Sequence, residues 1–432
     1  MQRILRGIAK RHIMKVAGLR LLPSCLLAAI TISSCSLQLP IGTLVPPHPT
    51  VTPIPEPPTI TANPTFTPIN YYYVDGRLGS DTNPGSIDLP WQTIERALES
   101  AIAGDMILVR GGEYQTIYGA WTFKHSGNES QPISLGNYPG EQVILKITNP
   151  DKHYGAFGCW NAPLDPPDWQ TPPASFIRIV GTDVLPQQVS DGILSSKGIV
   201  IEGVPGEAAG VEAGGDCDNW EISGVDFINV AFGIFTKKRN FQTTQDGSPN
   251  YWYVHDNRVY GYYAESGMQF NGNHNVIERN SIYKVTDELS TPYGCQLLNI
   301  SGNNNVIRDN ALSRLGSKAA CVGIMLEWDM ADANIIEQNT ISDAGRNGDG
   351  AIIIAGGDNN IIQNNTIYAT SPNWYYIYPN NDGITDWPCN EATGDPEGVP
   401  ANDPAAQDYQ YYYPHNCHSV GNQFYDNTYI NQ

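Results

Sequence analysis

The stretch Asn275-Val276-Ile277-Glu278-Arg279-Asn280 decides the fold, because close copies of it recur along the chain. The last asparagines of the four best copies are 30, 29 and 26 residues apart. These copies end at Asn280, Asn310, Asn339 and Asn365, and weaker copies end at Asn257 and Asn427. A repeat of this length indicates a solenoid, in which each turn buries its apolar face against the next one.

Each repeat contains three short strands and no helical periodicity. The repeated segment is the first strand, and a second strand follows it, as in Ser281-Ile282-Tyr283. A loop of variable length then leads to a third strand that opens at a glycine. We expect these third strands to begin at Gly233, Gly267, Gly294, Gly323 and Gly350. Three strands per turn of about 20 to 30 residues exclude a βαβ fold and predict an all-β, single-stranded parallel β-helix with turns about 4.8 Å apart.

The repeated asparagines are interpreted as structural. At one corner of every turn, an amide can form hydrogen bonds within its own turn and with the next. The predicted ladder comprises Asn257, Asn280, Asn310, Asn339, Asn365 and Asn427. A run of asparagines at this period therefore points to a corner ladder and not to a catalytic role.

Aligning the third strands on their glycines predicts which residues face the core. The inward stacks would be Ile234, Met268, Cys295, Ile324, Ala351 and Thr236, Phe270, Leu297, Leu326, Ile353. The outward stacks would be Phe235, Gln269, Gln296, Met325, Ile352 and Lys237, Asn271, Leu298, Glu327, Ile354.

The same alignment predicts the state of the cysteines. Cys321 falls about three positions from Cys295 along the strand, farther than the roughly 7 Å that a disulfide permits between α-carbons, so both are expected to be buried thiols. Cys389 and Cys417 could close an aromatic, turn-rich segment as a disulfide, whereas Cys159 and Cys217 are a weaker candidate pair. The leader described below is expected to direct the chain to an oxidising compartment, in which disulfides form.

The start of the repeat domain carries a resemblance. Tyr72-Tyr73-Val74-Asp75-Gly76, Gly79-Ser80-Asp81-Thr82-Asn83-Pro84-Gly85 and Pro90-Trp91-Gln92-Thr93-Ile94 are similar to the opening of many bacterial surface β-helices. With the repeats, the chain from about Tyr71 onward resembles the pectate-lyase-like superfamily. The resemblance implies a right-handed parallel β-helix. It does not identify an activity, because this fold carries lyases, hydrolases, epimerases and non-catalytic adhesins.

A short N-terminal helix is expected to cap the open end of the coil. Its apolar face would consist of Ile94, Ala97, Leu98 and Ala101, and it would cover the exposed edge of the sheet. The segment Met106–Tyr114 that follows is read as the first core strand and turn.

The N-terminus has the layout of a secretory signal. Six basic residues and no acid precede an apolar run, Leu21–Ile32, that ends in Ser33-Ser34-Cys35. This ending resembles the bacterial lipobox, so residues 1–35 are expected to be a lipoprotein signal in which Cys35 is lipidated. A transmembrane helix is the alternative, but the run is shorter than the roughly 20 residues that a span requires. Leu22-Pro23-Ser24-Cys25 is a poorer lipobox, because a proline lies within it.

Composition divides the rest of the chain. Residues 36–70 are rich in proline and threonine, which favours an extended tether. Residues 71–432 form the predicted β-helix domain, with insertions near 151–195 and 371–419. The chain would thus be exported and held as a monomer at the cell surface or extracellular face, contacting the membrane through its lipid anchor only.

The net charge of the chain limits the kinds of molecule that it can bind. The whole chain has a net charge of −20, and loss of the six basic leader residues lowers it to −26. Such a surface repels nucleic acid and unassisted polyanions. It suits a neutral or cationic glycan, or an acidic glycan bridged by Ca²⁺, which prefers oxygen ligands. The sequence identifies no cofactor beyond this possibility of Ca²⁺, and no metal ligands.

The candidate site lies on the outward face of the third strands, where an extended polysaccharide would lie. Glu327 and Asp329 share one face of a strand, and such a carboxylate pair can serve as acid and base in glycoside hydrolysis or ligate Ca²⁺. Lys318, Arg346 and Asp349 would lie on the rim, where a basic group could remove a proton next to a uronate carboxylate. The predicted substrate-binding residues are Gln269, Asn271, Gln296 and Trp328.

Three functions remain open from the sequence: a polysaccharide lyase, a β-helix glycoside hydrolase, and a non-catalytic glycan-binding or structural surface lipoprotein. Solvated acids and a solvent-facing lysine would look the same in the sequence. Aromatic residues in the insertion near 371–419 would either wall a sugar-binding groove or pack the insertion onto the coil. The combination of acids, bases and unequal loops favours a carbohydrate-active enzyme.

Overall fold

The computed structural model describes a large part of the predicted β-helix domain. The described residues are 66–115, 120–148, 155–160, 173–190, 192–206, 208–237, 248–287, 295–317, 319–327, 331–345, 350–355, 357–369, 375–377 and 421–431. The signal and Cys35, nearly all of the tether, and Cys389 and Cys417 lie outside them. Among the described residues, no helix combines the length and the apolar character needed to cross a membrane.

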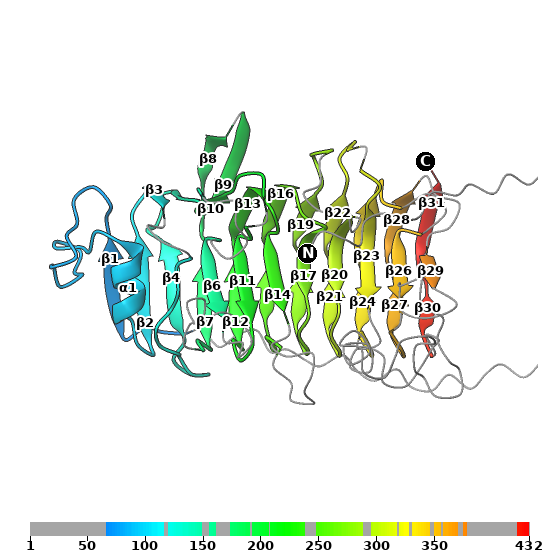
Figure 1. Ribbon diagram of the computed structural model, residues 1–432, viewed down its shortest axis with the longest axis horizontal. Helices are drawn as coiled ribbons and strands as arrows, with labels where there is room; N and C mark the ends of the chain where they lie inside the picture. Colours follow the sequence, from blue (N-terminus) through cyan, green and yellow to red (C-terminus); the bar gives the residue numbers. More distant parts are fainter. Residues whose placement is uncertain are drawn as a thin grey trace, which may run out of the picture. The chain divides into compact units, whose positions relative to one another are not determined.

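The described residues form a right-handed parallel β-helix with three long sheets (Figure 1). The first sheet contains β1 (Asn70–Val74), β2 (Asp105–Val109), β4 (Ile133–Asn137), β7 (Ile177–Val180), β12 (Trp220–Ser223), β15 (Tyr253–His255), β18 (Val276–Glu278), β21 (Val306–Arg308), β24 (Ile335–Glu337), β27 (Ile361–Gln363) and β30 (Gln423–Tyr425). Each strand pairs in parallel with its equivalent in the neighbouring turns, as the repeat predicts.

The second and third sheets follow in each turn. The second sheet contains β3 (Gly112–Gln115), β5 (Val143–Lys146), β10 (Ile199–Glu202), β13 (Val225–Val230), β16 (Arg258–Tyr262), β19 (Ser281–Tyr283), β22 (Ala311–Ser313), β25 (Thr340–Ser342), β28 (Thr366–Ala369) and β31 (Thr428–Asn431). The third sheet contains β6 (Phe157–Trp160), β11 (Val211–Gly214), β14 (Ile234–Lys237), β17 (Ser266–Phe270), β20 (Gln296–Ile300), β23 (Val322–Glu327), β26 (Ile352–Ala355) and β29 (Tyr375–Ile377). A separate antiparallel hairpin, β8 (Asp183–Ser190) with β9 (Ile193–Lys197), projects from the stack (Figure 1).

The expected helix is α1 (Ile94–Ser100), at the β1 end of the coil (Figure 1). The Thr93 hydroxyl caps it by accepting a hydrogen bond from the Arg96 amide at 3.2 Å. Its apolar residues Ile94, Ala97 and Leu98 are buried in the same core as the strands. The reading of Met106–Tyr114 as the first strand was wrong, because β1 precedes it and pairs with β2.

The predicted asparagine ladder is confirmed. From Asn257 to Asn427, the side-chain amide of each asparagine donates to the side-chain oxygen of the next at 2.9 to 3.1 Å. That same oxygen also accepts from the backbone amide of the preceding ladder residue. These asparagines follow the first-sheet strands and turn the chain into the second sheet.

A second ladder, which the sequence reasoning did not predict, precedes the same strands. Its residues are Asn275, Asn305, Asn334, Asn360 and Asn422. Both asparagines of the repeated segment are therefore structural, one at each end of the first-sheet strand.

The predicted register of the third strands was partly wrong. Met268 pairs with Leu298 and not with Cys295, while Leu298, Ile352 and Ile354, which were placed outward, are buried in the core. Conversely, Ile353 belongs to a small apolar cluster separate from that core.

The cause is a break in alternation in two third strands, β20 and β26. Leu297 and Leu298 are consecutive and both lie in the core. In the next turn, the amides of Gly323 and Ile324 both donate to the carbonyl of Ala351, at 2.8 and 3.1 Å. Ala351 and Ile352 are also consecutive core residues, as at a β-bulge, so alternation counted from the glycine fails in β20 and β26, whereas it holds in β14, β17 and β23.

The corrected register also changes the cysteines. Gln296 pairs with Val322, so Cys295 and Cys321 lie side by side with their α-carbons 4.4 Å apart and form a disulfide. The prediction of two buried thiols was therefore wrong. Cys159 and Cys217, the pair considered weaker, also form a disulfide, with an α-carbon separation of 6.2 Å.

Candidate functional site

The outer face of the third sheet carries polar side chains on successive turns, and we call it the third-sheet face. One outward column runs through the polar Glu212, Gln269 and Asn299 and the apolar Phe235 and Met325, and Gln269 and Asn299 lie on successive turns. A polar group at the same position in successive turns can contact successive units of an extended chain.

Glu327 ends β23 and is half-buried. Its Oε2 accepts a hydrogen bond from the Asn299 side-chain amide at 2.6 Å, and the Asn299 oxygen accepts from the Ser301 hydroxyl at 3.1 Å. The carboxylate is thus held by an amide that is itself fixed. This contact links two adjacent turns and orients Glu327 on the outer face.

Gln269 lies one turn before Asn299 and is almost completely buried. Its amide nitrogen donates to the Asn271 side chain at 3.3 Å, while its Oε1 has no hydrogen-bond partner within the described part of the chain. A buried amide oxygen of this kind calls for a donor, which a ligand hydroxyl or a water molecule can supply.

The structure places some of the predicted site residues on one face of the coil. Gln269, Asn271 and Glu327 share the third-sheet face. Gln296 lies nearer the start of its strand, where its Oε1 accepts from the Ser266 hydroxyl at 3.0 Å. Lys318, Trp328, Asp329, Arg346 and Asp349 lie outside the described residues.

Two residues of this face were not among the candidates. The predicted register placed Leu298 beside Glu327, whereas in the structure Asn299 contacts Glu327. Alternation counted from the inward pair Leu298 and Ile324 would have placed Asn299 on the outer face. Lys237 was expected to face outward, and its ammonium lies 5.8 Å from the centre of the Trp160 ring. The strand order puts Lys237 three turns from Glu327, roughly 14 Å at about 4.8 Å per turn, which is too far for both groups to act on one sugar unit.

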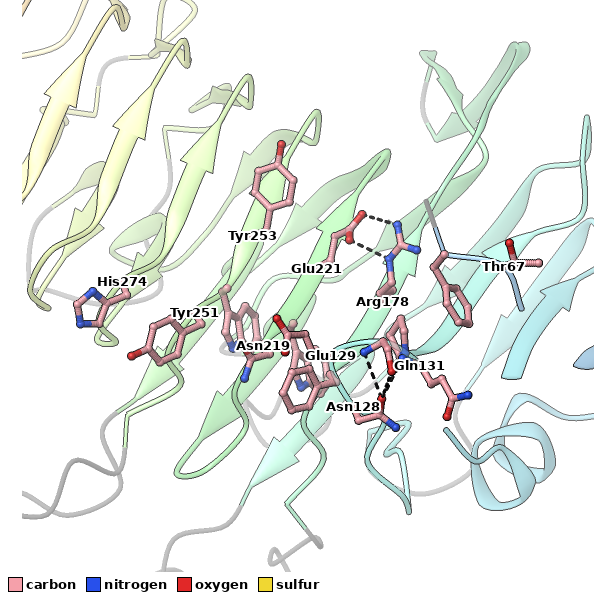
Figure 2. Close-up of a pocket in the computed structure, with 16 residues that line it drawn as sticks. Thr67, Asn128, Glu129, Gln131, Arg178, Asn219, Glu221, Tyr251, Tyr253 and His274 are labelled. Carbon is pink, nitrogen blue, oxygen red and sulfur yellow. Dashed lines mark hydrogen bonds and ion pairs between the residues drawn. The ribbon is translucent and has the colours of Figure 1, made fainter. Parts of the chain in front are cut away.

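A concave region, separate from the third-sheet face, lies on the outer face of the first sheet (Figure 2). It is a pocket of about 500 Å³ that we call the first-sheet pocket, bordered by the turn at residues 128–131 and by Tyr251 and His274. Arg178 and Glu221 line it and form two hydrogen bonds, from Nε at 2.8 Å and from Nη2 at 2.9 Å. Glu221 is only 6% exposed.

Farther along the first sheet, a network of charges begins at His255. Its Nε2 lies 3.6 Å from Glu221, and its Nδ1 lies 2.7 Å from Asp256. Burial would raise the pKa of Asp256, but hydrogen bonds from Arg279 and His255 outweigh it, so this pKa is lowered. Asp256 is therefore an ionised anchor at neutral pH.

Glu278 is the centre of the same network. It accepts hydrogen bonds from the Tyr253 hydroxyl and Arg308 Nε, both at 2.6 Å, and it contacts Arg279. Burial raises the pKa of Glu278, but these hydrogen bonds overcome the effect and lower it overall. The mutual pairing of these groups indicates that the network joins adjacent turns and is structural.

Metal binding has no support from the described residues. Within the ranges given above, no group of three or more histidine, cysteine or acidic side chains is arranged to hold a metal ion.

Comparisons with known proteins agree with the fold. A family model described as Pel9A-like, right handed beta helix region matches residues 72–246, which are 175 of the 432 residues. Among curated proteins, the uncharacterized protein YwoF of Bacillus subtilis is 37% identical over 76 residues, 18% of this chain and 15% of that protein. Pectate lyase PEL9 of Emericella nidulans is 43% identical over 67 residues, 16% of each. The matches thus span less than a fifth of either relative.

Solved structures show a more distant similarity. The complex of XylC with xylose is 12% identical, with a TM-score of 0.45 over 73% of this chain and 67% of that one. A rhamnogalacturonan lyase is 14% identical, with a TM-score of 0.43 over 72% and 73%. Pectate lyase Pel9A is 14% identical, with a TM-score of 0.38 over 71% and 75%.

Proposed function

We propose that this chain is a surface-anchored, carbohydrate-active protein that binds a polysaccharide along the third-sheet face and cleaves it near Glu327. The observation that carries the proposal is the contact between Asn299 and Glu327, which fixes a carboxylate on the outer face. This carboxylate lies two turns away from the buried Gln269 Oε1, which has no hydrogen-bond partner among the described residues. The partial match to a pectate lyase and the Pel9A-like family model support a polysaccharide as the substrate class.

The proposed chemistry depends on the groups around Glu327. With Asp329 as a second carboxylate, Glu327 would act as acid or base in glycoside hydrolysis. With Lys318 as the base and Arg346 stabilising the developing charge, the reaction would be β-elimination from a uronate. In that reaction the base removes the proton next to the carboxylate, and the glycosidic oxygen leaves from the adjacent carbon. Asp349 would lie on the rim, with Trp328 and Gln296 among the residues that contact the sugar.

The experiment is a polysaccharide panel assayed with and without Ca²⁺. New ultraviolet absorbance from unsaturated uronate identifies a lyase, whereas new reducing ends without it identify a hydrolase. Neither product, together with retained binding on a glycan array, would indicate the non-catalytic alternative.

The variant Glu327→Gln locates the site. It keeps the shape of the side chain and removes its charge, so turnover should fall by at least about 100-fold, as expected for loss of a general acid or base. Its melting temperature should change little, because substitutions away from the core usually shift stability by under about 0.5 kcal/mol. Glu337→Gln is the matched control, since Glu337 also accepts a hydrogen bond from a neighbouring side-chain amide, that of Gln363 at 2.8 Å, but on the first sheet.

The variant Lys318→Ala separates the two mechanisms. A lyase would lose its proposed base, whereas a hydrolase that uses two carboxylates would keep most of its rate. Full activity in both Glu327→Gln and Lys318→Ala, on a substrate that the wild-type protein cleaves, would move the site away from this part of the third-sheet face.

A further inference from the structure

One corner of the coil has an unusual backbone in successive turns. A residue one or two positions before each first-sheet strand from β7 to β27 has a positive φ, with values of 58° at Phe176, 59° at Asn219, 59° at Tyr251 and 57° at His274. The next turns carry Asn304, Ala333 and Asn359 there. Asparagine tolerates this conformation well, but bulky side chains in it are strained.

Two of the strained residues form an exposed aromatic platform. Tyr251 is 55% exposed, His274 is exposed, and their rings are stacked 5.1 Å apart with planes inclined by only 6° (Figure 2). Core packing does not explain these rings. The neighbouring stack of Trp220 on Trp252 does serve the core, and both tryptophans are 1% exposed. Exposed flat rings on a strained backbone motivate the hypothesis of a ligand site.

The platform borders the first-sheet pocket, which also offers polar groups. Within the described part of the chain, Arg178 uses Nε and Nη2 to bind Glu221, which leaves its Nη1 for another acceptor. The Asn219 side chain lies at the same corner, one turn before Tyr251, and the exposed Glu129 faces the platform from the opposite wall (Figure 2).

The charge of the pocket restricts the ligand. Arg178 is neutralised by Glu221, and Glu129 adds a further negative charge, while the chain as a whole is strongly acidic. An anionic ligand such as a uronate would be repelled, whereas hydroxyl groups can both donate to carboxylates and accept from a guanidinium. Flat rings stack on the apolar face of a pyranose.

We propose that the first-sheet pocket is a second glycan-binding site, which takes a neutral pyranose unit on the Tyr251–His274 platform. The sugar hydroxyls would bond to Glu221, Arg178 Nη1 and Asn219. This site is on a different sheet from the third-sheet face and does not depend on the cleavage proposed there. It would hold a neutral stretch of glycan against the coil.

The test is calorimetric titration of the full chain with cellotetraose, xylotetraose and mannotetraose, and with trigalacturonic acid as the acidic comparison. At least one neutral tetrasaccharide should bind, and trigalacturonic acid should not bind at this site. In Tyr251→Asn and in His274→Asn, binding should weaken about tenfold for the loss of one stacking ring. Asparagine already occupies this corner in other turns, so both variants should keep or raise the melting temperature.

Two further variants make the outcome decisive. Asn304→Ala changes the same corner away from the pocket and should leave binding unchanged. Glu327→Gln should also leave it unchanged, which separates this site from the third-sheet face. Absence of binding by all three neutral sugars overturns the proposal. So does binding that is lost in Glu327→Gln but kept in Tyr251→Asn and His274→Asn.

Discussion

At the scale of single residues, the asparagine ladder illustrates how one side chain stabilises two turns. The Asn310 oxygen accepts from both the backbone amide and the side chain of Asn280, at 2.9 and 3.1 Å. Its amide donates to Asn339 and to the carbonyl of Ile277, both at 2.9 Å. Asn310 is only 1% exposed, so water cannot replace these partners.

Replacing Asn310 by leucine should therefore destabilise the fold. The substitution leaves buried donors and acceptors unsatisfied, at a cost of about 1–3 kcal/mol. The melting temperature of Asn310→Leu should fall in differential scanning calorimetry. Thr340→Ala, an exposed change in β25, is the control and should melt like the wild-type protein. Equal melting of the two variants would contradict the structural role of the ladder.

Asp332 gives the fold a pH dependence at the residue scale. Burial raises the pKa of Asp332 to about 6, and the charge of Asp358 adds to this rise. The Asp358 backbone amide, which donates a hydrogen bond to the Asp332 carboxylate at 2.7 Å, opposes the rise. A carboxyl whose pKa is higher in the folded state than in the unfolded state contributes stability below its unfolded pKa, near 4. That contribution is lost as the pH rises through about 6.

The variant Asp332→Asn should remove this dependence. The amide oxygen can still accept from Asp358, but it never ionises. At pH 7 the variant should be more stable than the wild-type protein by about 1 kcal/mol, after allowance for solvent screening, and at pH 4 the gain should vanish. Urea titrations at both pH values test this. A gain of equal size at the two pH values would show that ionisation is not the cause.

At the scale of elements, the first and second sheets were predictable, whereas the third was less so. Strands such as β18 and β21 stand between two asparagines in every turn, so sequence alone fixes their pairing. The third strands follow loops of unequal length, and two of them, β20 and β26, have two consecutive inward residues near their start, such as Leu297 and Leu298. A glycine marks roughly where such a strand begins but does not fix its alternation.

That difference determined how well the candidate site could be predicted. Gln269 and Glu327 were placed on the correct face, because β17 and β23 keep the alternation counted from their glycines. The contact of Glu327 with Asn299 depends on the pairing of β20 with β23, which the glycine alignment displaced. The Tyr251–His274 platform was missed because the strand pattern does not reveal a positive φ at the corner before the strand.

The disulfides of the third sheet give a prediction at the element scale. Cys295–Cys321 joins β20 to β23, and Cys159–Cys217 joins the β6 and β11 turns. None of these four cysteines should react with a thiol reagent in urea without reductant, as peptide mass mapping can check. Replacing both Cys295 and Cys321 by alanine should destabilise the protein by about 2–4 kcal/mol. Alkylation of either cysteine in unreduced protein would contradict the pairing.

At the scale of the whole molecule, the β-helix domain follows a tether and an N-terminal signal that the sequence predicts. Anchoring through Cys35 remains a prediction. Cys35→Ser should abolish lipid labelling and move the protein from the membrane fraction to the soluble fraction. Cys25→Ser is the control and should fractionate like the wild-type protein. Equal distribution of Cys35→Ser and wild-type protein would rule out the lipid anchor.

The two disulfides have a consequence when the molecule is pulled from its ends. A coil in which each turn pairs only with its neighbours can peel away turn by turn from a free end. Each disulfide, however, closes one turn into a covalent ring that force cannot open. Cys295 and Cys321 are 26 residues apart, so their disulfide keeps about 90 Å of chain, at roughly 3.5 Å per residue, from extending. Among the described residues, peeling from the C-terminus would therefore meet its first permanently shortened turn at Cys321, and a reductant would lengthen the stretched chain.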